Sequence, residues 1–293
     1  MNDFTPGPKS NPLAGFMRQP KIYIRLPSKG AFWPEGSIVI PDNEELAVYS
    51  MTAKDELTFK TPDALMNGQG VVDVIQSCIP AIKDAWKTPT LDLDAILIAI
   101  RIATYGELMS LSHTVPNTAE EVDYQIDLRV LLDQLVNSSP WNEVVEISKD
   151  LTCFVKPLTY KHMTATSLKT FETQKLMQGI NDESVPDEQK VELFNRTFKI
   201  MTDITTDLVA DSVMAIHTPD ASVNDPVFIK EFLENADKSI FQKIQDHVAA
   251  QRELTKLKPV TITSAPEHVA LGAPETYEIP IIIDNADFFG QGS

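Results

Sequence analysis

The side chains that could do chemistry are scattered along this chain. A metal site or catalytic pair built on histidine would need Cys, Asp or Glu at ligand spacing from it, and no histidine has such neighbours. The histidines are His113, His162, His217, His247 and His268. Each is therefore interpreted as a packing or solvent-facing residue, and we expect no metal site.

Motifs for nucleophilic or phosphate chemistry are also missing from the sequence. Gly68-Gln69-Gly70 lacks the third glycine, the Lys and the Ser/Thr of a phosphate-binding loop, so it is interpreted as a break between two short helices. Ser28 and Lys29 are adjacent in a turn, where two side chains rarely meet as a catalytic dyad. There is no Gly-x-Ser-x-Gly elbow. We expect no catalytic residue and no enzyme activity.

The carboxylate pairs have a structural explanation. Asp92 and Asp94 stand where a helix is predicted to begin, and negative charge there favours the helix dipole more readily than it indicates a metal site. The only cysteines, Cys78 and Cys153, lack neighbours suited to metal binding and cannot make a disulfide scaffold. We expect no cofactor, and a reducing compartment.

Composition narrows the classes of partner. The formal net charge is −17, which argues against nucleic acid and against anionic membranes as partners. An acidic surface favours solubility and basic partners. The first 20 residues lack the apolar core of a signal peptide, and the most apolar stretch, Ala95–Ala103, is short for a membrane span and contains Arg101.

The hydrophobic pattern predicts an α+β fold. Residues 1–20 are expected to be a flexible arm, and residues 21–158 a mixed module of short strands and helices. Strands are expected at Lys21–Leu26, Ser37–Ile40 and Leu46–Ser50, the last leading to a capping box of Thr52 and Asp55. Short helices are expected at Thr61–Asn67, Gly70–Ile79 and Leu128–Val136.

The centre of this module is a predicted buried helix, Leu91–Tyr105, which ends at Gly106; its β-branched residues leave a strand open as the alternative. Polar and apolar residues alternate in Val122–Leu128, which predicts a hairpin with Leu108–Val115. A second hairpin is expected to join Val144–Ile147 to Thr152–Val155.

Residues 159–258 form the predicted helical module. One helix is expected at Tyr160–Gly179, and a second opens at Val185-Pro186. Apolar residues at three- and four-residue steps predict the core face of that second helix. They are Val191, Phe194, Phe198, Met201, Leu208, Val209, Val213 and Ile216. A third helix from Asp225 to Gln251 is expected to pack antiparallel to the second.

Residues 259–293 form the predicted tail, a strand hairpin followed by a docking segment. Its strands, Val260–Thr263 and Tyr277–Ile283, echo the hairpin at Leu108–Leu128, because each unit is a strand, a polar loop and a Tyr-containing strand. Bulky aromatics in turns and tails are typical partner anchors. The anchor candidates are Phe32, Trp33, Phe288 and Phe289, with packing onto the chain's own body as the open alternative.

Several segments follow one another in a familiar order. They are Leu26-Pro27-Ser28-Lys29-Gly30, Met51-Thr52-Ala53-Lys54-Asp55-Glu56, Ile96–Gly106 and the ending Ile283–Gly290, which reads Ile-Asp-Asn-Ala-Asp-Phe-Phe-Gly. As a set they resemble the baseplate hub protein family of T-even-like contractile-tailed bacteriophages. Phe228–Ala236 is similar to the matching region of larger members.

The resemblance implies a structural or assembly component of the phage tail baseplate hub that acts by protein–protein docking. The implied partners are other baseplate hub proteins and the tape measure protein, with assembly in the host cytoplasm and a place in the virion tail baseplate. Self-association stays open, since no heptad run is long enough to establish a trimer. The alternative is an assembly chaperone for the tape measure or hub proteins, absent from the mature virion.

The sequence departs from the family in one respect. Members can carry Cys-x-x-Cys pairs in the two hairpin regions, which resemble zinc ribbons. Here those regions read Ser112–Asn117 and Thr263–His268, without cysteine. A zinc site is therefore not carried over, and packing alone is expected to hold these hairpins.

Overall fold

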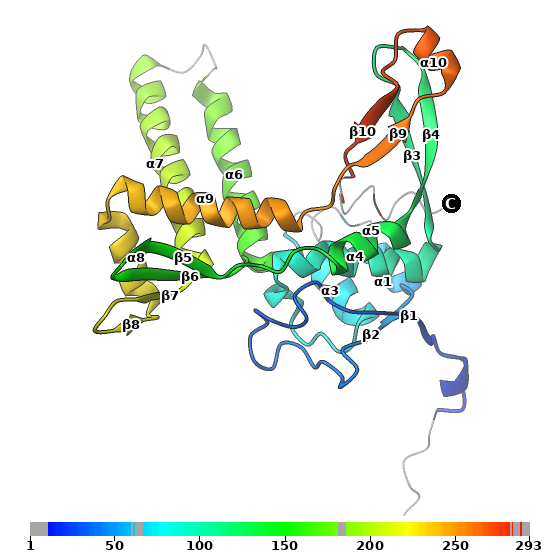
Figure 1. Ribbon diagram of the computed structural model, residues 1–293, viewed down its shortest axis with the longest axis horizontal. Coiled ribbons are helices and arrows are strands. Elements are labelled where there is room, and N and C mark those ends of the chain that lie inside the picture. The colour runs from blue at the N-terminus through cyan, green and yellow to red at the C-terminus, as the bar shows by residue number, and fades with distance from the viewer. Residues whose placement is uncertain are drawn as a thin grey trace, which may run out of the picture.

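The chain adopts an α+β fold, as the sequence predicts. The computed structural model describes residues 11–59, 61, 67–180, 186–281, 283 and 288. Two projections rise from one side of a central body: a pair of long helices and an arm of paired strands (Figure 1). The predicted helix at Thr61–Asn67 lies mostly outside the described residues.

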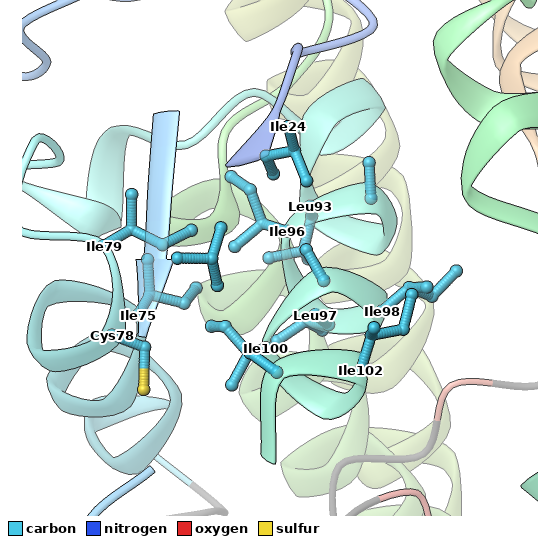
Figure 2. Close-up of a cluster of buried hydrophobic side chains, with 14 of the residues drawn as sticks. Ile24, Ile75, Cys78, Ile79, Leu93, Ile96, Leu97, Ile98, Ile100 and Ile102 are labelled. Carbon is cyan, nitrogen blue, oxygen red and sulfur yellow. The ribbon is translucent and has the colours of Figure 1, made fainter. Parts of the chain in front are cut away.

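The first hydrophobic core surrounds α4 (Thr90–Tyr105), which is the predicted central helix. Around it lie α3 (Gln69–Cys78), α5 (Leu128–Val136) and the antiparallel pair β1 (Pro20–Ile24) and β2 (Leu46–Tyr49). Figure 2 shows Ile96 and Ile100 on the side of α4 that faces Ile75, Cys78 and Ile79, and Ile98 and Ile102 on the other side. Because apolar neighbours cover nearly its whole circumference, burial outweighs the weak helix propensity of its β-branched residues.

Short elements connect and flank the parts of the first core. The 3₁₀ turns η1 (Ala14–Phe16) and η2 (Ala85–Lys87) precede β1 and α4. Helix α1 (Ala53–Phe59) begins with the predicted capping box: the Thr52 amide donates to Asp55 Oδ2 at 2.7 Å, and the Asp55 amide donates to Thr52 Oγ1 at 3.2 Å. The predicted strand Ser37–Ile40 is reduced to one isolated bridge, between Ile38 and Ile82.

The second core lies under a four-stranded antiparallel sheet in the order β5-β6-β7-β8. The strands are β5 (Val144–Ser148), β6 (Leu151–Val155), β7 (Val213–His217) and β8 (Ser222–Val223). Helices α8 (Pro226–Asn235) and α9 (Lys238–Thr255) contribute Ile229, Leu233, Ile244 and Val248 to this core. The predicted hairpin thus shares a sheet with a strand from beyond residue 158, where the sequence places a module boundary.

Two predictions for the helical region are wrong. Helix α7 (Asp187–Ser212) does not continue to Ile216, because residues 213–217 pair with β6 as a strand. The predicted third helix is divided into α8 and α9 near Ala236, and this break lets both pieces turn apolar residues to the second core.

Helix α7 runs beside α6 (Tyr160–Ile180) along its length (Figure 1). The antiparallel neighbour of α7 is therefore α6. The sequence analysis predicted the third helix in this position, and that prediction is wrong. Helices α8 and α9 contact α7 as shorter elements.

The strand arm consists of two hairpins (Figure 1). Strands β3 (Leu108–Thr114) and β4 (Glu121–Asp127) form the first, and β9 (Val260–Thr263) and β10 (Thr276–Ile279) form the second, which carries α10 (Pro266–Ala270) in its loop. Both hairpins were predicted from alternating polarity. The two units that echo each other in sequence pack together around a third, small core. Its members are Leu111, Val115, Val122, Tyr124, Ile262, Ala273, Tyr277 and Ile279.

Candidate docking surfaces

The turn at Leu26–Gly30 is fastened to the first turn of α4. Asp92 is fully buried, and its carboxylate accepts from the Ser28 amide at 2.8 Å, the Ser28 hydroxyl at 2.5 Å and the Trp33 indole Nε1 at 2.7 Å. Burial raises the pKa of Asp92 to about 6, although these donors favour the charged form. Ser28 therefore serves a structural hydrogen bond. The sequence attributed Asp92 to the helix dipole and missed its role in holding this turn.

Gly30 closes the same turn in a left-handed conformation, with φ of 86°. A Cβ at this position would lie 2.0 Å from Ile40 Cδ1. Glycine is therefore favoured here both by the backbone conformation and by the close approach of Ile40.

Phe32 and Trp33, two of the predicted anchors, differ in their surroundings. Trp33 is partly buried against the first core and is held by Asp92. Phe32 lies edge-on to Trp141, with ring centroids 6.4 Å apart, and Trp141 in turn packs against the second core. These aromatics thus link the N-terminal loop to both cores. Their docking role stays a prediction.

Phe288, the third predicted anchor, lies in the first core, with 5% of its surface exposed. Arg101 Nη1 donates to the Phe288 backbone oxygen, and the guanidinium lies 5.1 Å from the Phe288 ring centroid. The docking role of Phe288 also stays a prediction, with its side chain turned inward in this chain. Phe289 lies outside the described residues.

The two hairpins of the strand arm are joined by side chains. The hydroxyls of Tyr124 and Tyr277 share a hydrogen bond. The His113 ring stacks on the Tyr277 ring, with the ring centroids 6.1 Å apart. His268 Nε2 lies 2.9 Å from Glu120 Oε2. Each contact crosses from the first hairpin to the second. Among the described residues, no group of three or more His, Cys, Asp or Glu side chains could hold a metal ion.

A cavity of about 310 Å³ lies where α6 and α7 meet α8. The charged side chains that line it pair with one another. Asp207 Oδ1 lies 2.7 Å from Lys230 Nζ, and Asp207 Oδ2 lies 3.5 Å from Lys169 Nζ. His162 Nε2 lies 3.8 Å from Asp211 Oδ2. Such a network fixes the base of the helix pair. It offers no nucleophile with a positioned base.

One face of α7 is apolar and exposed. Val191, Phe194, Phe198 and Met201 are 60%, 57%, 66% and 52% exposed, and we call these four residues the α7 stripe. The sequence predicted them as a core face, and this prediction is wrong. The face that packs beside α6 instead carries Thr197, which is 3% exposed, and the partly buried Ile200 and Ile204.

The N-terminal arm is a second exposed apolar segment. Leu13, Phe16 and Met17 are 64%, 88% and 54% exposed. Arg18, which follows them, donates to the Ser50 and Ser77 carbonyl oxygens, each at 2.6 Å. The arm thus leaves the body from a fixed point and extends away from it (Figure 1).

Comparison with known proteins gives this arrangement a context. The sequence model of the family described as T4 bacteriophage base plate protein matches residues 34–269. The chain belongs to this base plate protein family. The family places it among the structural proteins of the phage tail, as a virion tail component that interacts with other tail proteins.

No curated protein and no solved structure matches this base plate protein. No helix among its described residues is long and apolar enough to cross a membrane.

Proposed function

We propose that this base plate protein is a component of the baseplate hub, where it acts by docking to other hub proteins and to the tape measure protein during assembly in the host cytoplasm. The family membership supports the baseplate role. The hub position rests on the resemblance of the Leu26–Gly30, Met51–Glu56 and Ile283–Gly290 segments to hub proteins. The proposed role is non-enzymatic.

The observation that carries the docking role is the N-terminal arm. Phe16 is 88% exposed, although an aromatic ring in water forgoes the stabilisation that burial would give. Arg18 fixes the base of the arm through Ser50 and Ser77, so Leu13, Phe16 and Met17 are presented from a defined position. A few side chains buried in a partner commonly supply most of the binding energy of an interface.

The four aromatics predicted from the sequence remain the second set of docking candidates. Phe32 contacts Trp141 by its edge and retains partial exposure, so its ring can serve a partner without leaving its site. Trp33 and Phe288 would act by positioning the loop and the C-terminal segment, since each is held by the body.

Infection with a phage that encodes the affinity-tagged full chain tests the proposal. We expect the wild-type protein to co-purify with hub proteins and the tape measure protein, and to occur at stoichiometric amounts in purified virions by mass spectrometry. Phe16→Asp should reduce this recovery at least tenfold. Val227→Asp is the matched control, because Val227 is 69% exposed outside the arm.

Two outcomes would overturn parts of this proposal. Equal recovery of partners by Phe16→Asp and Val227→Asp would remove the arm from the docking mechanism. Co-purification during infection with absence from virions would instead support an assembly chaperone.

A further inference from the structure

The far end of the strand arm is apolar and exposed. Helix α10 and the turn that follows it lie at this end (Figure 1). Val269 and Leu271 are 38% and 59% exposed there, with the exposed Ala270 between them. Successive residues with helical backbone dihedrals point about 100° apart, so these three side chains surround the end of the arm as a knob. We call Val269, Ala270 and Leu271 the strand-arm tip.

Contacts between the two hairpins hold the tip in place. Asn117 Nδ2 donates to the Gly272 backbone oxygen at 3.2 Å, and His268 Nε2 lies 2.9 Å from Glu120 Oε2. Ala273, which follows the tip by two residues, is 6% exposed in the third core. The tip is therefore positioned before any partner arrives, so docking there would cost little conformational entropy.

The charges of the strand arm have one sign. Residues 108–127 and 260–279 contain seven Asp or Glu residues and no Lys or Arg, so they contribute −7 to the formal net charge of −17. Glu120 is the one of these acids that forms an ion pair within the described part of the chain, with His268. Four of the acids are exposed at the far end of the arm, around the tip. They are Glu120, Glu121, Glu267 and Glu275.

We propose that the strand-arm tip docks into an apolar recess of another protein, and that Lys or Arg residues line the rim of that recess. Docking would remove the apolar side chains of the tip from water, and the four carboxylates around it would face the basic rim. The complementary charge on the partner would also steer the projecting arm into its recess.

The same charges exclude other occupants of this surface. Nucleic acid and anionic membranes would be repelled by a projection that carries seven carboxylates and no Lys or Arg. A twofold contact between the tips of two copies would set the same carboxylates against one another. A basic protein surface meets neither obstacle.

The inference deepens the proposed docking role, and it rests on that role for the presence of a partner protein in the infected cell. It adds a docking surface apart from the N-terminal arm and specifies the chemistry of the partner.

Photo-cross-linking from the tip identifies the protein that covers it. The tagged full chain is produced during infection with the photo-cross-linker p-benzoylphenylalanine in place of Leu271, whose exposure makes the exchange compatible with the fold. Irradiation should give a covalent adduct with one other protein, which mass spectrometry then identifies; the proposed function predicts a tail protein. No adduct, or an adduct with a second copy of this chain, would overturn the inference.

Charge reversal tests the basic rim. Glu267→Lys/Glu275→Lys in the cross-linking chain would set like charges together at the interface, so the adduct yield should fall at least about tenfold. Glu146→Lys/Asp150→Lys is the matched control, because both acids are exposed outside the strand arm and form no ion pair within the described residues. Its yield should be unchanged, and so should the circular dichroism of both variants. Equal yields for the two double variants would overturn the basic rim.

Failure of this inference and failure of the hub role give different results. An adduct with a protein outside the tail would contradict the hub role and leave the tip as a docking surface. Recovery of hub and tape measure proteins without any adduct from the tip would contradict this inference alone.

Discussion

Arg101 and Phe288 are 187 positions apart in the chain and meet in the first core. Arg101 donates to the Phe288 backbone oxygen and lies over its ring. Burial lowers the pKa of Arg101, because the charged form loses solvation. The contact secures the C-terminal segment to α4, and through α4 to the turn that Asp92 holds.

Phe288→Ala should lower the free energy of unfolding by about 3 kcal/mol, the order found for deleting a buried aromatic ring. Chemical denaturation of the purified chain measures this. The control is Phe16→Ala, which should stay within about 0.5 kcal/mol of wild type because Phe16 is exposed. Identical midpoints for Phe288→Ala and wild type would mean that the C-terminal contact does not stabilise the fold.

Asp92 should make stability depend on pH. Its folded-state pKa of about 6 lies above the ordinary value of 3.8, so its contribution is fully present below pH 3.8 and is lost as the pH rises through 6. The loss is roughly 3 kcal/mol at most, from about 1.4 kcal/mol per unit. Asp92→Asn should remove this loss, and its amide oxygen can still accept from the Trp33 indole. Unfolding free energies at pH 4, 5, 6 and 7 test it; parallel curves for variant and wild type would contradict the expectation.

Tyr124 and Tyr277 should be energetically coupled. Removing either hydroxyl leaves the other without its partner, so Tyr124→Phe and Tyr277→Phe should each destabilise by about 1 kcal/mol, and the double variant should cost little more than one of them. A double-mutant cycle by denaturation measures the coupling. Strictly additive effects would show that the two hairpins do not depend on this contact.

The preference for glycine at position 30 has two causes, and substitutions can separate them. Gly30→Ala and Gly36→Ala both place a side chain at positive φ, 86° and 76°, which costs about 1 kcal/mol each. Only the Cβ at Gly30 meets a neighbour, Ile40. Gly30→Ala should therefore be the more destabilising, and Gly30→Ala/Ile40→Val should recover part of the difference. Equal costs for the two glycine substitutions would exclude the Ile40 contact as a cause.

Local pattern predicted most elements of this fold. Helix α5 and the strands of both arm hairpins follow from periodicity over few residues, because a strand pair joined by one turn is determined by its own sequence. The sequence left open whether Trp33 docks to a partner or closes the N-terminal module. Its bond to Asp92 involves residues 59 positions apart, which no local pattern records.

The predictions from sequence were wrong where a neighbouring element decides the local structure or the buried face. Residues 213–217 continue the apolar spacing of α7, yet β6 offers them a strand edge and they extend. The α7 stripe has the spacing of a core face, but spacing shows only that a face is apolar. Which face is covered within the chain depends on where α6 lies.

The central claim is that this base plate protein works by docking through exposed apolar surfaces, first of all its N-terminal arm. The most direct measurement is quantitative mass spectrometry of proteins that co-purify with tagged wild type, Phe16→Asp and Val227→Asp from infected cells. Hub and tape measure proteins should co-purify with wild type and with Val227→Asp, and their recovery with Phe16→Asp should fall at least tenfold. Equal recovery with all three, or no tail protein with wild type, would contradict it.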